Sequence, residues 1–262
     1  MVKKEKNGVI YFEFEHFAKV GLVNHCFSSR IGGVSKEPFT SLNLAYHMGD
    51  HPADVDENFK LICEAVGFNR EKVRMTKQIH QAGIYVVESE SPVPEGIDSL
   101  ITAIPDDVLT TYYADCVPLL FLDPVKKVIA NSHAGWRGTL AEISKKTVAR
   151  MVEEFESRPQ DILVGIGPSI SFKYFEVGCE VAEAFKQQLS LVTPYLHQKS
   201  DEKWHIDLLA INYKLLIEAG VLEKNIEVSN LCTVENPDVF YSHRRDGSAR
   251  GNMVAMIALK TK

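Results

Sequence analysis

The 262-residue sequence lacks the marks of several large protein classes. No apolar run reaches the roughly 18 residues that a membrane-spanning helix needs, and lysine and arginine form no clustered basic stripe. Since nucleic-acid binding depends on neutralising phosphates, a net charge of −6 without such a stripe predicts that nucleic acid is not a partner. We therefore expect neither a membrane nor a nucleic acid as partner, and a small molecule as ligand.

The cysteines form no recognisable framework. They are five in number, widely spread and without a C-x-x-C pair: Cys26, Cys63, Cys116, Cys179 and Cys232. This pattern predicts neither disulfides nor a zinc knuckle. The first residues, MVKKEKNGVIYFEF, contain charges but no apolar segment followed by a small-residue cleavage site. We expect a cytoplasmic protein with reduced thiols.

No internal repeat, low-complexity tract or Gly/Ser linker marks a boundary, so we predict a single domain over residues 1–262. With 45% hydrophobic residues the chain can bury a large core. Apolar runs predict strands, and stripes at helical spacing predict helices. The strands are expected within 9–14, 23–29, 72–80, 83–88, 99–102, 108–115, 118–123, 127–133, 161–167 and 250–260, and the helices within 54–66, 139–155, 178–189 and 207–220. This order predicts an α+β or layered architecture.

The segment SHAGWRGT, residues 132–139, joins a predicted buried strand to a predicted helix. Thr139 and Glu142 fit a T-x-x-E capping box, which places the helix start at Thr139. Unpaired N–H groups at that start, with Arg137 beside them, would favour a phosphate or carboxylate. A tight strand-to-helix connection is the alternative.

His80, Cys116 and His133 are candidate metal ligands because each ends or follows a strand-like run. Taken singly, such residues are more often core or surface residues. Together, two imidazoles and one thiolate suit Zn²⁺ and tolerate copper, and three protein ligands leave a fourth position open. Their wide spacing in the sequence does not by itself show that they meet.

Seven segments of the sequence resemble the motifs of a known family: SSRIGGVS…PFTSLNLAYHMGD, KQIHQ, DSLIT, ADCVPLLFLDP, SHAGWRGT, VGIGPSIS…YFEVG and FYSHRRDG. In this order, from about Phe27 to Gly251, they closely resemble the YfiH/YlmD family, also called the laccase-domain or polyphenol oxidase family. The resemblance implies that His80, Cys116 and His133 are the metal ligands. It also implies a layered α/β/β/α sandwich with mixed sheets.

The family has been described both as a copper phenol oxidase and as a purine nucleoside phosphorylase with adenosine deaminase activity. A multicopper oxidase needs a second, histidine-rich metal centre, usually carried on His-x-His pairs, and none of the nine histidines forms such a pair. Phosphorolysis fits better, since it needs an anchored phosphate and a pocket for base and ribose. Deamination would use the same metal, because zinc lowers the pKa of its bound water to about 7. We therefore expect purine nucleosides and phosphate as substrates.

The remaining candidates come from polar loops. The possible phosphate clamps are Arg30, Arg137, Arg244 and Arg245, because arginine forks match phosphate oxygens. Asp115 and His47 are candidates for proton transfer or for support of the metal ligands. Asn43 and Asp50 have the polarity to contact ribose, and His243 could line the pocket mouth. The H-x-E and P-C-x-x-C signature of zinc deaminases is absent, which leaves the proton carrier unassigned.

Two alternatives to the phosphorylase stay open. A laccase-like, copper-dependent polyphenol oxidase would oxidise phenols in proportion to bound copper and without phosphate. A structural-zinc interaction module would fill the fourth coordination position with a protein side chain, although a chain of this size needs no metal to fold.

Overall fold

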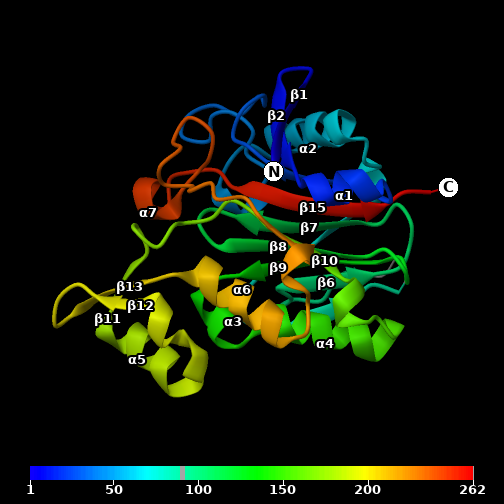
Figure 1. Ribbon diagram of the computed structural model, residues 1–262. Helices are drawn as coiled ribbons and strands as arrows, with labels where there is room; N and C mark the ends of the chain where they lie inside the picture. Colours follow the sequence, from blue (N-terminus) through cyan, green and yellow to red (C-terminus); the bar gives the residue numbers. More distant parts are fainter. Residues whose placement is uncertain (89–91, 262) are drawn as a thin grey trace.

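The computed structural model describes residues 1–88 and 92–261. Two six-stranded sheets are stacked face to face, with helices on the outer face of each, so the layers are α/β/β/α (Figure 1). The first sheet has the order β1 (Val2–Lys6), β2 (Val9–Glu13), β3 (Val23–Ser28), β15 (Met253–Leu259), β7 (Val108–Tyr113), β4 (Val73–Met75). Its pairs are antiparallel except β4 and β7, which run parallel.

The second sheet is also mixed. Its order is β14 (Ile226–Val228), β10 (Leu163–Ile166), β8 (Val117–Asp123), β9 (Val128–Ala134), β6 (Ser99–Thr102), β5 (Ile84–Val86). The two edge pairs, β14 with β10 and β5 with β6, are parallel, and the inner pairs are antiparallel. The layered α+β sandwich with mixed sheets is therefore confirmed.

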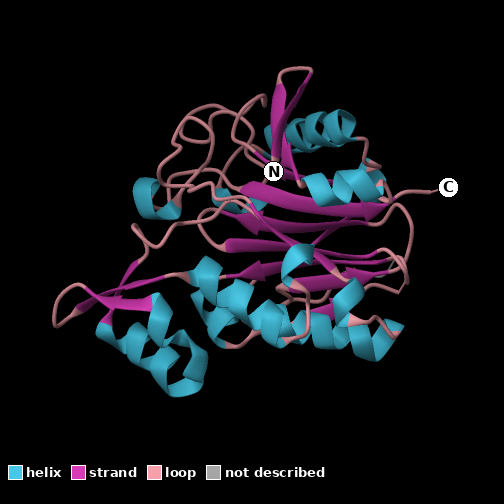
Figure 2. Cartoon of the chain, viewed as in Figure 1, coloured by secondary structure: helices cyan, strands magenta, loops and turns pink. Residues whose placement is uncertain are grey.

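The helices cover the two outer faces, and a small third sheet projects at one end (Figure 2). The helices are α1 (Glu15–Val20), α2 (Pro52–Val66), α3 (Trp136–Leu140), α4 (Ile143–Phe155), α5 (Cys179–Gln188), α6 (Leu208–Glu218) and α7 (His243–Asp246). The small sheet has the order β11 (Glu176–Gly178), β13 (Lys203–Ile206), β12 (Leu196–Gln198). Among the described residues, no helix is both long and apolar enough to cross a bilayer.

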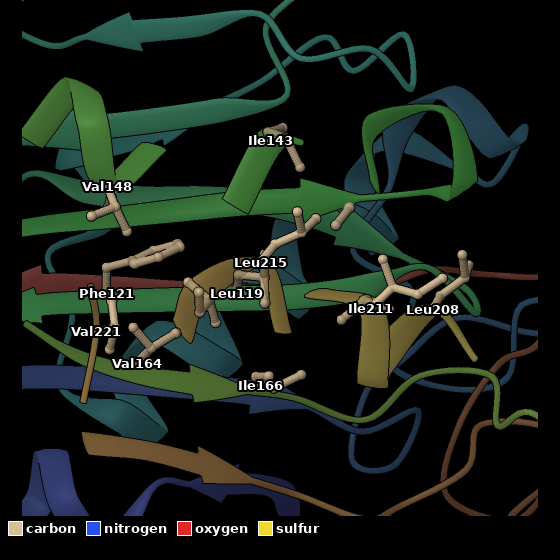
Figure 3. Close-up of a cluster of buried hydrophobic side chains, with 14 of the residues drawn as sticks. Leu119, Phe121, Ile143, Val148, Val164, Ile166, Leu208, Ile211, Leu215 and Val221 are labelled. Atoms are coloured by element: carbon tan, nitrogen blue, oxygen red, sulfur yellow. The ribbon is translucent and has the colours of Figure 1, made fainter. Parts of the chain in front are cut away.

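The central strands are apolar on both faces because each face packs on a different layer. In β8, Leu119 and Phe121 pack toward the helices, in the cluster that Figure 3 shows with Ile143, Leu215 and their neighbours. The alternate residue Leu120 packs instead between the two sheets. A third cluster fills the space between the first sheet and α2. Side chains alternate across a strand, so continuous apolar runs are what this double burial requires.

The predicted helix at 54–66 is confirmed as α2, which starts two residues earlier, at Pro52. It ends as expected, at Gly67, whose φ of 88° is the left-handed conformation that glycine adopts without strain.

The predicted capping box at Thr139 and Glu142 is wrong. The chain already turns helical at Trp136, with Gly135 as N-cap, so Thr139 lies inside α3. Its hydroxyl accepts a hydrogen bond from the Asn212 side chain at 2.8 Å. Glu142 has a φ of 58°, which separates α3 from α4, and forms no side-chain cap. Tertiary contacts have therefore replaced the local capping signal.

Candidate metal and nucleoside site

Cys116 and His133 are brought together by the pairing of neighbouring strands. β8 and β9 run antiparallel, and their register places Pro118 opposite His133. Cys116 lies where the chain crosses from β7 in the first sheet to β8 in the second. Because β8 begins where β9 ends, the thiol and the imidazole lie at the same end of the sandwich.

Asp98 brings His80 to the same place. It directly precedes β6, which pairs with β9, and its carbonyl accepts the backbone N–H of His133 at 2.8 Å. The Asp98 carboxylate accepts three consecutive backbone N–H groups, those of Ile79, His80 and Gln81, at 3.0 to 3.1 Å. His80 itself is in the left-handed region, with φ 61°. The predicted strand over 72–80 therefore ends early, at Met75, and His80 stands in a loop that Asp98 organises.

The three predicted ligands converge. Their donor atoms all lie within 4.8 Å of one another, and exposure rises from buried His133 through Cys116 to exposed His80. His133 Nδ1 is 2.8 Å from Asp98 Oδ1; because an ionised carboxylate only accepts, Nδ1 carries a proton, and Nε2 is the nitrogen that a metal would bind in place of its proton. An arrangement of carboxylate, histidine and metal of this kind is typical of zinc sites.

Gly135 keeps the space between the ligands open. A Cβ at this position would lie 3.1 Å from His80 Cδ2 and 3.3 Å from Cys116 Sγ. It would also lie 3.6 Å from His133 Cε1, so a methyl group would touch all three side chains. The donor set and this clearance both fit a zinc or copper ion bound by two imidazoles and a thiolate.

The electrostatics of the cluster favour the metal-binding form of cysteine. Burial raises the pKa of Cys116, but the positive charge and hydrogen bonds of the neighbouring histidines outweigh burial and lower that pKa to about 6. Burial lowers the pKa of His133, whereas the Cys116 thiolate and the Asp98 carboxylate raise it to about 9. Burial also raises the pKa of Asp98, which its hydrogen bonds bring below the usual value. Cys116 is thus a thiolate at neutral pH, the form that binds metals.

Two cavities meet at this cluster. The polar cavity, of about 380 Å³, is lined by His47, Thr76, Lys77, Gln78 and others. The aromatic cavity, of about 460 Å³, is lined by Trp136, Ile170, Phe175 and Val177 together with polar residues. They share His80, Ala114, Cys116 and Arg250. Both volumes fall in the range of small-molecule sites, about 300 to 1,000 Å³.

Asp115 lines the aromatic cavity, but both of its carboxylate oxygens are already used. Oδ1 accepts the Thr233 hydroxyl at 2.6 Å, and Oδ2 accepts the backbone N–H of Arg244 at 2.7 Å. Its φ of 95° is strained for a residue with a side chain. Asp115 therefore links the segment between β7 and β8 to the start of α7 by a hydrogen bond.

His47 lies where the sequence places it, at the pocket. It is exposed, lines the polar cavity and packs edge-on against Tyr112, with ring centroids 5.7 Å apart. Desolvation by the cavity wall and then the charge of Arg250 lower the pKa of His47, so the ring is neutral at pH 7.

Two predicted substrate contacts lie elsewhere. Arg30 donates to the carbonyls of Thr40 and Pro237 and stacks on Tyr241 at 4.6 Å, outside the lining of both cavities. Asn43 is fully buried; its Nδ2 donates to the Ala45 carbonyl and to Asp50, and its Oδ1 accepts the backbone N–H groups of Ala45 and Asn252. These two side chains hold loops in place, and the structure does not bring them to the pocket.

Of the other arginines, Arg244 reaches a cavity. Arg137 is exposed and stacks at 4.2 Å on Trp136, which lines the aromatic cavity, and its own side chain is not among the lining residues of either cavity. Arg245 is bound to Asp246 and to three backbone carbonyls. Arg244 lines the aromatic cavity beside His243 and donates to the Tyr174 carbonyl at 2.6 Å.

Sequence reasoning did not single out Asp98 and Arg250. Asp98 stands in the string DSLIT, and its position directly before a strand was the available signal. Arg250 precedes the closing strand β15 and resembles the other loop arginines in its sequence surroundings. Its distinction is purely spatial, because it lines both cavities.

An α/β/β/α sandwich with a His/Cys/His cluster at one end defines the class of protein. Residues 24–260 match the family described as multi-copper polyphenol oxidoreductase laccase. The chain belongs to this laccase-domain family.

Relatives within the family carry another description. The chain is 33% identical to "Purine nucleoside phosphorylase YlmD" of Bacillus subtilis, over 89% of this chain and 87% of the relative. It is 38% identical to a purine nucleoside phosphorylase of Deinococcus radiodurans, over 90% and 89% of the two chains. The crystal structure of the hypothetical protein YfiH of Bacillus licheniformis superposes with a TM-score of 0.91 at 29% identity, covering 98% of this chain and 99% of the other.

Proposed function

We propose that this protein is a metal-dependent purine nucleoside phosphorylase that also deaminates adenosine. The observation that carries the proposal is the opening of one His/Cys/His cluster onto two joined cavities, which gives adjacent space to a nucleoside and to a second substrate. The names of the relatives support the phosphorylase. The whole chain, 1–262, acts as one catalytic domain, and the expected substrates are adenosine, inosine or methylthioadenosine with phosphate.

Phosphorolysis breaks the bond between ribose C1′ and purine N9 and forms a bond between C1′ and a phosphate oxygen. The electron pair of the broken bond leaves with the base, which takes up a proton, and the other product is ribose 1-phosphate. The protein must hold phosphate and nucleoside on opposite sides of C1′, exclude water and carry a proton to the base. His47, neutral at pH 7 and facing the polar cavity, is our candidate for moving a proton.

His80, Cys116 and His133 would hold the metal, with zinc preferred and copper tolerated. When bound, such an ion supplies Lewis-acid chemistry and lowers the pKa of water to about 7, as deamination requires. Deamination replaces the C6 amino group of adenosine by the oxygen of water and releases ammonia. Asp98 orients the His133 imidazole and holds the backbone of His80, and Asp115 positions α7 at the mouth of the aromatic cavity.

The multi-copper description of the family receives less support from this chain. Across residues 1–88 and 92–261, one cluster of three or more His, Cys, Asp or Glu donors has metal-binding spacing. Oxidation of phenols by coupled copper centres needs donors for a second centre, so the donor count favours the phosphorylase.

Product analysis tests the proposal. Zinc-loaded protein is incubated with adenosine, with and without phosphate, and the products are separated. We expect adenine and ribose 1-phosphate only with phosphate, and inosine plus ammonia in both samples. Phenol oxidation that scales with copper and ignores phosphate would replace the proposal by an oxidase. A fourth protein ligand on the metal, with no turnover of either kind, would replace it by a structural zinc.

A further inference from the structure

Arg250 lies at the boundary between the two cavities. It lies three residues before β15 and lines both the polar and the aromatic cavity, each time beside His80 and Cys116. Asp98 and Asp115 sit close to the same cluster, so the site combines a fixed arginine with fixed carboxylates. Arg250 could therefore bind a negatively charged ligand at this site.

The guanidinium of Arg250 is held in place by its own loop. Nη1 donates to the Asn252 side chain and to the Gly251 carbonyl, the latter at 3.2 Å, and Nη2 lies 3.4 Å from His243 Nδ1. The backbone N–H of Asn252 in turn donates to Asn43 Oδ1 at 3.0 Å. These contacts fix the direction of the arginine fork before any ligand arrives.

Arg250 is nevertheless incompletely satisfied. Its Nε is buried and has no hydrogen-bond partner among the described residues, and those residues include no carboxylate that forms a salt bridge with Arg250. The carboxylate of Asp115 is already bonded at both oxygens. A partly buried cation without a carboxylate partner costs free energy, which an anion bound nearby recovers. Burial accordingly lowers the pKa of Arg250 from its ordinary value.

The neighbouring arginines contrast with it. Arg245 is neutralised by Asp246, and Arg30 is bonded to carbonyls and stacked on a tyrosine. Arg244 is exposed and lines only the aromatic cavity, not the polar one. Arg250 is therefore the arginine that faces the polar cavity, where Lys77 and Gln78 add polar groups.

We infer that Arg250 holds the attacking phosphate in the polar cavity, while the purine base of the nucleoside lies in the aromatic cavity against Trp136 and Phe175. This inference rests on the proposed function. The guanidinium charge of Arg250, which no carboxylate neutralises, favours an anion in the cavity, and aromatic rings offer stacking surfaces to a purine. The shared wall lets the two substrates meet at C1′ from opposite sides.

The test compares phosphate and adenosine kinetics in Arg250→Gln and Arg250→Lys. Arg150→Gln is the matched control, because Arg150 is on the outer helix α4, lines neither cavity and pairs with Glu153 and Glu154. Loss of the positive charge is expected to raise the KM for phosphate about tenfold or more in Arg250→Gln. Lysine keeps the charge without the fork and gives a smaller increase. The KM for adenosine stays close to that of the wild type.

A second measurement uses inorganic phosphate alone. Calorimetric titration of the zinc-loaded protein is expected to show phosphate binding that is weakened in Arg250→Gln and retained in Arg150→Gln. Phe175→Ala is expected to raise the KM for adenosine and to leave phosphate binding intact.

Equal phosphate affinity in wild type and Arg250→Gln would overturn the inference. So would a parallel rise of both KM values with loss of bound zinc, which is the result of a purely structural role. If Arg250→Gln does not fold, Arg250→Lys decides by the same criteria. A wild type that binds phosphate through Arg250 but releases no base would refute the proposed function and leave the anion site standing.

Discussion

At the scale of single residues, the chemistry of the site depends on a few groups that bind no substrate. Gly135 leaves space between the ligands, and the Asp98 carboxylate holds both the His133 imidazole and the backbone of His80. The identity of the three ligand residues alone does not reveal either effect. Both can be tested through metal binding alone.

Gly135→Ala should weaken metal binding without unfolding the protein. The backbone of Gly135, with φ −70° and ψ 176°, suits alanine, so the added methyl acts on its neighbours rather than on the chain. It would press on His80 and Cys116 at 3.1 and 3.3 Å. We expect about tenfold weaker zinc affinity, as for other disturbed ligand supports, with little change in melting temperature. Competition with a chromophoric chelator measures the affinity, and an unchanged value would show that the clearance has no role.

Asp98→Asn should lower zinc affinity by about 10- to 100-fold, because the amide keeps one acceptor oxygen where the carboxylate uses two, one for His133 Nδ1 and the His80 N–H and the other for the N–H groups of Ile79 and Gln81. Asp123→Asn is the matched control: its carboxylate is also fully buried and accepts two backbone N–H groups, in the turn after β8. The control is expected to lose stability and keep its zinc affinity. Equal effects of the two substitutions on affinity would contradict a specific role of Asp98.

At the scale of elements, the site exists because two stacked sheets stay in register with each other. Asn131, fully buried in the middle of β9, links the sheets. Its Nδ2 donates to the carbonyls of Leu109 in β7 and Ala255 in β15, at 2.9 and 2.8 Å, and its Oδ1 accepts the Thr111 hydroxyl at 2.6 Å. One asparagine thus joins three strands across the interface between the sheets.

Asn131→Leu should destabilise the protein by about 3 kcal/mol, since three hydrogen bonds are lost and a buried hydroxyl loses its acceptor. Asn225→Leu serves as comparison, because Asn225 also donates to two carbonyls but near the surface. Urea unfolding of both variants measures the difference. A loss below that of Asn225→Leu would mean that the link between the sheets contributes little.

Sequence patterns predicted the elements well where burial alone decides them. The doubly apolar runs of β8 and β9 and the striped helix α2 match the predicted ranges to within two residues at either end. The start of α3 was missed because Asn212, distant in sequence, occupies the hydroxyl of Thr139. The metal ligands followed from the family resemblance, and their convergence could not be derived from spacing. Arg250 was missed because only its position in space separates it from arginines that are bonded to carbonyls.

At the scale of the whole molecule, a buried histidine couples stability to pH. His25 in β3 is 2% exposed, and its Nε2 accepts the backbone N–H of Phe14 at 2.8 Å. Burial, and then the charge of His16, lower the pKa of His25 to about 3. The unfolded chain binds this proton near pH 6.5. The contribution to stability is therefore complete above pH 6.5 and is lost as the pH falls toward 3.

His25→Gln keeps a hydrogen-bond acceptor and removes the titration. Between pH 6 and 4, the free energy of unfolding of the wild type should fall more steeply than that of the variant, by about 1.4 kcal/mol per pH unit. Urea unfolding at several pH values measures both slopes. Parallel slopes would show that His25 is protonated as readily in the folded protein as in the unfolded chain.

We propose that His80, Cys116 and His133 hold one metal that serves phosphate-dependent cleavage of a purine nucleoside. The most direct measurement is the amount of adenine and ribose 1-phosphate formed from adenosine by zinc-treated wild type, Cys116→Ala and His133→Ala, with and without phosphate. We expect phosphate-dependent products from the wild type and loss of both phosphorolysis and deamination in the two variants. Undiminished phosphorolysis in either variant would contradict it.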